Sequence, residues 1–218
     1  HEGYLAATKK GLAFSPTGEG WTVVDRSFKE ECTCLSSTGK LNTPQTLVFI
    51  GTTSGVYYLN VDDYFDEESE NKKVVLLSNY SQKLPSTYIN SLSYNTKKDI
   101  LVSAGLGGIS VLNNASTYAN SEAGDILASD YANYTSGDGL TGTTCYSVLW
   151  TSSENKLIVG TSNGLSITTD FRSWTQITRI ANSENVNSDQ RLTNHVCNKI
   201  IREGTNLYTV LHGVGLTE

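Results

Sequence analysis

Few residues of this chain have the types and spacing that enzyme chemistry needs. Its 3 His stand at positions 1, 195 and 212, and they form no Ser-His-Asp order with other residues and accompany no paired carboxylates. Hydrolytic and general acid–base catalysis require a nucleophile, a base and an orienting group within hydrogen-bond reach. The sequence therefore predicts a protein that is not an enzyme and has no catalytic residues.

The 4 Cys residues lack the spacing of a metal site. Cys34, Cys145 and Cys197 fall in nearly the same position of a repeated strand as Ile89, which is typical of an apolar, buried position. Equivalent positions of neighbouring repeats lie farther apart than the roughly 7 Å between Cα atoms that a disulfide spans. No His stands near Cys32 at the spacing of a zinc site. We expect buried thiols, with two disulfides as the alternative.

Two acidic segments are the candidates for a cation site. Residues 62–70 are rich in Asp and Glu but contain no Gly for the sharp turn of a calcium loop, so a solvated insertion is expected there. Residues 130–138 have a better spacing of oxygen ligands, but the Asp-Gly pair at their end also suits a turn before a strand. The sequence predicts no metal and no cofactor.

Aromatic and polar residues in the long connections are the candidates for ligand binding. These connections span residues 79–88, 131–144 and 182–195, whereas the opposite connections, such as residues 153–156, are short. Aromatic side chains there could stack on a sugar or anchor a protein partner, and long loops on a rigid scaffold are common binding sites. The alternative is that they only fasten the loops. The predicted ligand-binding residues are Tyr80, Tyr88, Tyr134, Asp138 and His195.

A repeated phrase predicts the elements that would position these residues. An apolar strand leads to a corner of small or polar residues, then to Gly and an aliphatic residue, and then to a further strand. The repeated corner glycines are Gly11, Gly55, Gly108, Gly164 and Gly215. They stand about 44 to 56 residues apart, as expected for one supersecondary unit with loops of varying length.

Each repeat contains four strands with alternating patterns, and no stretch has a convincing helical period. The fold class predicted is an all-β propeller of four-stranded antiparallel blades, with about 4.5 blades in one domain over residues 1–218. The array begins inside one blade and stops inside another, which favours a segment of a larger propeller. The residues assigned to outer strands are 74–77 and 125–128, together with strands after Trp21 and Trp174, which we expect to pack between neighbouring blades.

Residues 134–148 and 156–165 resemble the two-component-regulator type of β-propeller repeat. The likeness lies in Asp138-Gly139-Leu140, in Val148 near the end of the next strand, and in a hairpin that closes on Gly164. The position of the family's hairpin Trp is filled by other residues here, and residues 168–174 are similar to a degenerate Asp-box. The resemblance implies an extracytoplasmic module of sensor regions, secretion systems or surface assemblies that binds glycans or proteins and is seldom catalytic.

Composition limits the partners further. With 218 residues, 16 Lys and Arg that do not cluster, and a net charge of −6, the chain is not expected to bind nucleic acid. No apolar run approaches the length of a transmembrane segment. The chain opens at His1 rather than Met, so we expect a terminus made by processing or truncation.

The function predicted is a non-catalytic recognition or assembly scaffold that binds a protein or a glycan through the loops of one propeller face. Its expected location is extracytoplasmic: periplasmic, at the cell surface or secreted, as part of a larger assembly. One alternative is a glycan-active propeller enzyme whose catalytic residues lie partly outside this segment. The other is a structural subunit of a surface filament or virion. A carboxylate pair or an Arg-Tyr cluster around a central pocket would favour the enzyme.

Overall fold

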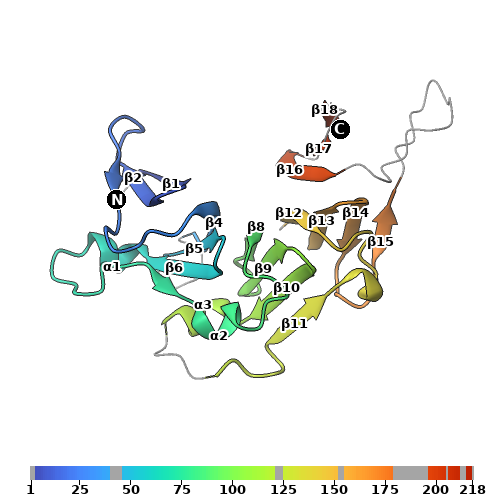
Figure 1. Ribbon diagram of the computed structural model, residues 1–218, viewed down its shortest axis with the longest axis horizontal. Coiled ribbons are helices and arrows are strands. Elements are labelled where there is room, and N and C mark those ends of the chain that lie inside the picture. Colours follow the sequence, from blue (N-terminus) through green and yellow to red (C-terminus); the bar gives the residue numbers. More distant parts are fainter. Residues whose placement is uncertain are drawn as a thin grey trace.

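The computed structural model describes residues 3–39, 46–120, 125–151, 155–178, 196–204, 206–211 and 215–217. These residues form five antiparallel sheets that follow one another along the chain and make an open array (Figure 1). The predicted all-β fold built from four-stranded antiparallel units is confirmed. A propeller remains a prediction, because the described sheets do not close on one another.

The three central sheets have four strands each, and the first and last have three. The first sheet consists of β1 (Tyr4–Thr8), β2 (Gly11–Ser15) and β3 (Thr22–Val23). The second consists of β4 (Cys32–Ser37), β5 (Leu47–Thr52), β6 (Val56–Asn60) and β7 (Val75–Leu76). The third consists of β8 (Ile89–Asn95), β9 (Ile100–Gly105), β10 (Gly108–Asn113) and β11 (Tyr131–Tyr134). The fourth consists of β12 (Cys145–Thr151), β13 (Lys156–Thr161), β14 (Gly164–Thr168) and β15 (Thr175–Ile177). The fifth consists of β16 (Cys197–Glu203), β17 (Asn206–Leu211) and β18 (Gly215–Thr217).

In the last four sheets a corner glycine stands where the third strand leaves its hairpin, and in the first sheet Gly11 begins the second strand, β2. Gly108 and Gly164 have φ angles of +132° and +114°, in the region that favours glycine. A Cβ atom on Gly164 would lie 2.5 Å from the carbonyl oxygen of Ile177, and one on Gly108 would collide with the carbonyl oxygen of Tyr134. Glycine is required there because the outer strand passes directly over the corner.

The strands β4, β8, β12 and β16 are the first of their sheets and are called the inner strands here. Each begins with a β-bulge, and the first residues of these bulges are Cys32, Ile89, Cys145 and Cys197. The structure therefore corrects the predicted register at one place, since the residue equivalent to Ile89 is Cys32 rather than Cys34. The prediction counted back from the corner glycine, and the connection between β4 and β5 is longer than its counterparts.

Hydrogen bonds join the inner strands of neighbouring sheets in a repeated pattern. The Ser36 hydroxyl oxygen accepts from the backbone N–H of Tyr94 at 3.0 Å, and the Ser93 oxygen accepts from that of Trp150 at 2.9 Å. Ser36 and Ser93 occupy the same position in their sheets, as their pairing with the second strands shows. Ser91 accepts from the N–H of Val148 at 3.2 Å. Polar side chains of one inner strand thus bind the backbone of the next.

Two expectations about the outer strands need correction. The outer strand of the third sheet is Tyr131–Tyr134, and residues 125–128 form no strand. Trp21 and Trp174 do immediately precede equivalent outer strands, β3 and β15. Trp174 packs in a core cluster, but Trp21 is 47% exposed and does not lie between sheets.

Short helices occupy connections in which the sequence shows no helical period. They are α1 (Val61–Phe65), α2 (Ser78–Ser81), α3 (Ala115–Asn120) and the 3-10 helix Ser136–Asp138. Asn60 caps α1 by accepting from the N–H groups of Asp62 and Asp63, so the acidic segment begins as a helical turn. No described helix is long and apolar enough to cross a lipid bilayer.

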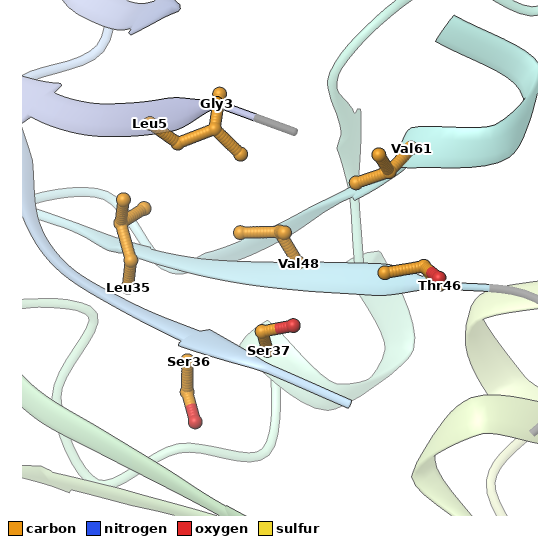
Figure 2. A pocket seen from close by; sticks show the side chains of 8 residues that line it. All are labelled: Gly3, Leu5, Leu35, Ser36, Ser37, Thr46, Val48 and Val61. Carbon is orange, nitrogen blue, oxygen red and sulfur yellow. The ribbon is translucent and has the colours of Figure 1, made fainter. Parts of the chain in front are cut away.

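A groove of about 340 Å³ lies between the first two sheets (Figure 2). Its walls come from Gly3 and Leu5 on one side and from β4, β5 and the start of α1 on the other. Of the eight lining residues, Leu5, Leu35, Val48 and Val61 are aliphatic, and Ser36, Ser37 and Thr46 are polar.

Candidate binding surface

One end of the sheets gathers the hairpin tips and the segments that lead into the inner strands. The tips are residues 53–54, 106–107 and 162–163, and the lead-in segments are residues 29–31, 86–88 and 142–144; together we call them the tip face. The Ser162 N–H donates to the Thr144 carbonyl at 2.9 Å, and Leu106 forms a β-bridge with Thr144. The loops of the tip face are therefore connected to one another by backbone hydrogen bonds.

Tyr88 and Leu106 are the large apolar side chains exposed on the tip face. Tyr88 is 43% exposed and Leu106 is 51% exposed. Tyr88 directly precedes Ile89, which pairs with Gly105, so the two side chains emerge at neighbouring strand ends. A Cβ atom on Gly105 would lie 2.5 Å from the Tyr88 carbonyl oxygen, which shows how closely the two backbones approach. Tyr88 and Leu106 are therefore the apolar side chains of the tip face that a partner could cover.

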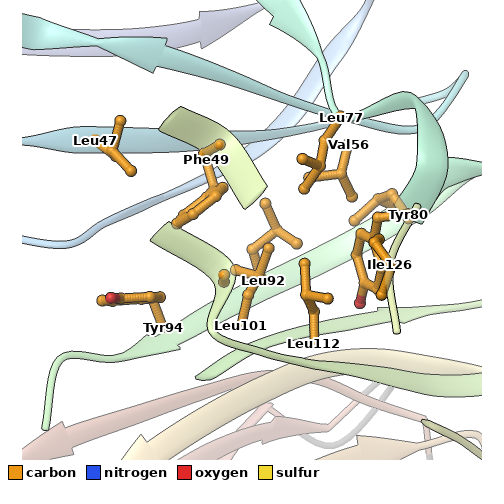
Figure 3. Packing of buried hydrophobic residues seen from close by; sticks show 13 residues of the cluster. Leu47, Phe49, Val56, Leu77, Tyr80, Leu92, Tyr94, Leu101, Leu112 and Ile126 are labelled. Carbon is orange, nitrogen blue, oxygen red and sulfur yellow. The ribbon is translucent and has the colours of Figure 1, made fainter. Parts of the chain in front are cut away.

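Tyr80, a predicted ligand-binding residue, belongs to the core instead (Figure 3). Its side chain is 0% exposed. Its hydroxyl group lies 2.8 Å from Ser103 Oγ and donates to the Ser110 carbonyl at 3.0 Å, in the middle of the third sheet. Burial raises the pKa of this phenol above its ordinary value. The helix α2 turns Tyr80 between the second and third sheets, which removes it from any surface site.

Tyr134 lies at the end of β11, and neighbouring aromatic rings half-cover it. Its ring stacks on Phe171 with centroids 5.4 Å apart, and the Trp174 ring lies 5.9 Å away. Burial raises the pKa of Tyr134, followed by the effect of the Asp138 carboxylate. Tyr88 and Tyr134 are at opposite edges of the same sheet, about 14 Å apart at a strand spacing of about 4.8 Å. The two residues therefore do not share one small-ligand site.

The residues Asp138-Gly139-Leu140 form a turn that is closed by the Asp138 side chain. Its carboxylate accepts from the N–H of Thr135 at 2.8 Å and from the Thr135 hydroxyl at 3.0 Å, which closes a capping box. Gly139 follows with φ of +115°, against the Trp174 ring, and Leu140 is buried in the core. The phrase thus fixes a turn that inserts Leu140 between sheets.

His195 lies outside the described residues. Of the predicted ligand-binding residues, Tyr88 is the one that the structure places exposed on the tip face; Asp138 is exposed but bound within its turn, and Tyr134 is an inter-sheet contact. Sequence reasoning missed Leu106. The signal was its place between Gly105 and Gly107 in a hairpin tip, where a large apolar residue has no core to enter.

The cysteines are thiols rather than disulfides, as expected. Burial raises the pKa of Cys32 and of Cys34 to about 11 and that of Cys145 to about 12. A thiol of this kind stays protonated and unreactive at neutral pH. Within the part of the chain that the structure describes, no three His, Cys, Asp or Glu side chains form a group that could hold a metal ion.

Comparisons with known proteins show a likeness in fold. No protein-family model matches the sequence, and a search of curated proteins found no match. The extracellular domain of the hybrid two-component system BT4673 from B. thetaiotaomicron is similar over 97% of this chain and 24% of its own, with 16% identity and a TM-score of 0.66. PorZ, a surface component of the type-IX secretion system of Porphyromonas gingivalis, is similar over 97% and 29%, with 15% identity and a TM-score of 0.59.

A structure of the nidogen/laminin complex is similar over 96% of this chain and 66% of that chain, with 8% identity and a TM-score of 0.60. At such identities the likeness concerns the arrangement of the sheets alone. The present chain spans about a quarter of the BT4673 chain and somewhat more of the PorZ chain.

Proposed function

We propose that this chain is a non-catalytic, extracytoplasmic recognition domain, built from blades of a β-propeller, that binds a protein partner through the tip face. The observation that carries the proposal is the pair Tyr88 and Leu106, which are 43% and 51% exposed at neighbouring strand ends, on a surface whose loops are bonded to one another. The propeller assignment is supported by the repeated four-stranded unit and by the bonded inner strands. The similarity to extracellular and surface proteins supports the location.

A protein partner fits this surface better than a glycan. Sugar recognition by stacking needs an aromatic face with polar groups that converge on the same ring. Tyr88 has an aliphatic neighbour instead. The other predicted aromatic residue, Tyr134, lies about 14 Å from Tyr88, which is three strand spacings. Its ring already stacks on Phe171. An exposed aromatic residue beside an aliphatic one is typical of the centre of a protein interface.

Site-specific photocrosslinking in the native organism tests the proposal. A benzophenone amino acid is placed at position 88 or at position 106, and at position 127 as the matched control. Leu127 is 63% exposed but lies in the connection between α3 and β11, away from the hairpin tips. We expect one discrete protein adduct from positions 88 and 106 and none from 127.

Three outcomes would contradict the proposal. No adduct at either tip position, or an equal adduct at all three positions, would reject the tip face as the interface. A glycan that binds with an affinity sensitive to Tyr88→Ala would assign the surface to sugar recognition instead. Turnover of a glycan would favour the alternative of an enzyme.

A further inference from the structure

The β-bulge of each inner strand contains one residue that the pairing with the second strand skips. In β4 this residue is Thr33, and in β8 it is Asn90, each the second residue of its strand. A bulge re-aims side chains, because two residues of one strand oppose one residue of the other. Both of these polar side chains reach the next sheet along the chain.

Thr33 holds the lead-in segment that ends at Tyr88. Its Oγ1 donates to the Ile89 carbonyl oxygen at 2.5 Å, and Ile89 directly follows Tyr88. The Tyr88 carbonyl oxygen in turn lies so close to Gly105 that a Cβ atom there would be 2.5 Å from it. A shift of Ile89 would therefore displace both the Tyr88 ring and the hairpin tip beside it.

Asn90 holds the lead-in segment that ends at Thr144. Its Nδ2 donates to the Cys145 carbonyl oxygen at 2.8 Å. Thr144 directly precedes Cys145 and forms the β-bridge with Leu106. The third sheet therefore binds this segment at two places, through a side chain of its inner strand and through its hairpin tip.

These two bonds lie at the tip-face end of the inner strands, unlike the other hydroxyl bond between β4 and β8. Ser36 is the fifth residue of β4 and accepts from the Tyr94 N–H at 3.0 Å, whereas Thr33 is the second residue. Loss of either side chain should weaken the contact between the second and third sheets. Only the loss of Thr33 should release the lead-in segment before Ile89.

We propose that Thr33 and Asn90 are positioning residues of the tip face, each of which fixes the lead-in segment of the next sheet for partner binding. The inference rests on the proposed function, since it assigns Thr33 to the placement of Tyr88 and Asn90 to that of Leu106. Both side chains are half-buried and act through a backbone carbonyl, so neither needs to touch the partner. A surface that is already ordered costs less free energy to bind.

Hydrogen exchange of the chain without a partner tests the positioning. Thr33→Val removes the hydroxyl group and should make the amides of residues 86–91 exchange about fivefold faster, as for the loss of one hydrogen bond. Asn90→Ala should do the same for residues 142–147. Thr33→Ser keeps the hydroxyl group and should leave the exchange slow. Ser36→Ala is the matched control, because it removes a bond between the same two sheets and should leave the exchange of residues 86–91 unaltered.

Site-specific photocrosslinking in the native organism tests the consequence for binding. With the benzophenone amino acid at position 88, Thr33→Val should lower the yield of the protein adduct at least about threefold, because the lead-in segment must then be ordered on binding. With it at position 106, Asn90→Ala should lower the yield to the same extent. Ser36→Ala should leave both yields unaltered.

The outcomes separate a failure of this inference from a failure of the proposed function. Unaltered exchange in Thr33→Val and Asn90→Ala would overturn the inference, and so would adduct yields that these variants leave unchanged. An equal loss of adduct in Ser36→Ala would also overturn it, because the effect would then follow from stability alone. No adduct from the unaltered chain at position 88 or 106 would reject the proposed function and this inference with it.

Discussion

Replacing Tyr80 with Phe removes one oxygen atom from the interface between the second and third sheets. The Tyr80 hydroxyl lies 2.8 Å from Ser103 Oγ and 3.0 Å from the Ser110 carbonyl oxygen, and the side chain is fully buried. Without it, the Ser103 hydroxyl and the Ser110 carbonyl lose a partner where water does not reach them. Leaving buried polar groups in this state costs about 1 to 3 kcal/mol.

We therefore expect Tyr80→Phe to lower the free energy of unfolding by about 2 kcal/mol, which corresponds to a melting temperature roughly 4 to 8 °C lower for a chain of this size. Urea titration and thermal unfolding followed by circular dichroism measure both quantities. Tyr88→Phe is the matched control, because the Tyr88 side chain is 43% exposed and should change the stability by less than about 0.5 kcal/mol. Unaltered unfolding of Tyr80→Phe, or an equal loss in both variants, would refute the assignment of Tyr80 to the core.

Three further predictions concern the thiols, the capping turn and the tryptophans. Burial raises the pKa of Cys145 from its ordinary 9.0 to about 12 in the folded chain. The contribution of this thiol to stability is therefore complete below pH 9 and is lost as the pH rises from 9 toward 12. Cys145→Val should make the free energy of unfolding fall less steeply with pH between pH 9 and pH 11. Asp138→Ala should cost about 1 kcal/mol in urea unfolding through loss of the two bonds from Thr135, and no loss would contradict the capping role. Trp174→Ala should cost about 3 kcal/mol and Trp21→Ala less than about 0.5, and equal effects would restore their predicted equivalence.

The sequence predicts well those features that every repeat must share. The corner glycines can be recognised in the sequence because a Cβ atom at Gly108 or Gly164 would clash with the outer strand, so that no other residue fits there. The apolar start of the inner strands can be recognised in the sequence at Ile89 and Cys145 because each repeat buries that position. Repetition lets a weak local signal be read several times, which is why the all-β architecture could be predicted.

What varies between repeats could not be predicted in the same way. Ile126 made residues 125–128 look like a strand, but it is an apolar residue of a connection, 5% exposed, that inserts into the core. Tyr80 looked like a loop residue because α2 is too short to show a helical period. Both side chains fill the space between the second and third sheets, and such inter-sheet contacts leave no periodic trace in the sequence.

The polar inner strands have a consequence for how partners recognise this fold. The hydroxyls of Ser36, Ser91 and Ser93 satisfy backbone N–H groups of the next sheet, so the order of the sheets is set by directional bonds as well as by apolar packing. The hairpin tips of the third and fourth sheets both bond to Thr144, through Leu106 and Ser162, which fixes Leu106 on a prearranged surface. A partner that binds the tip face then has little loop ordering to offset.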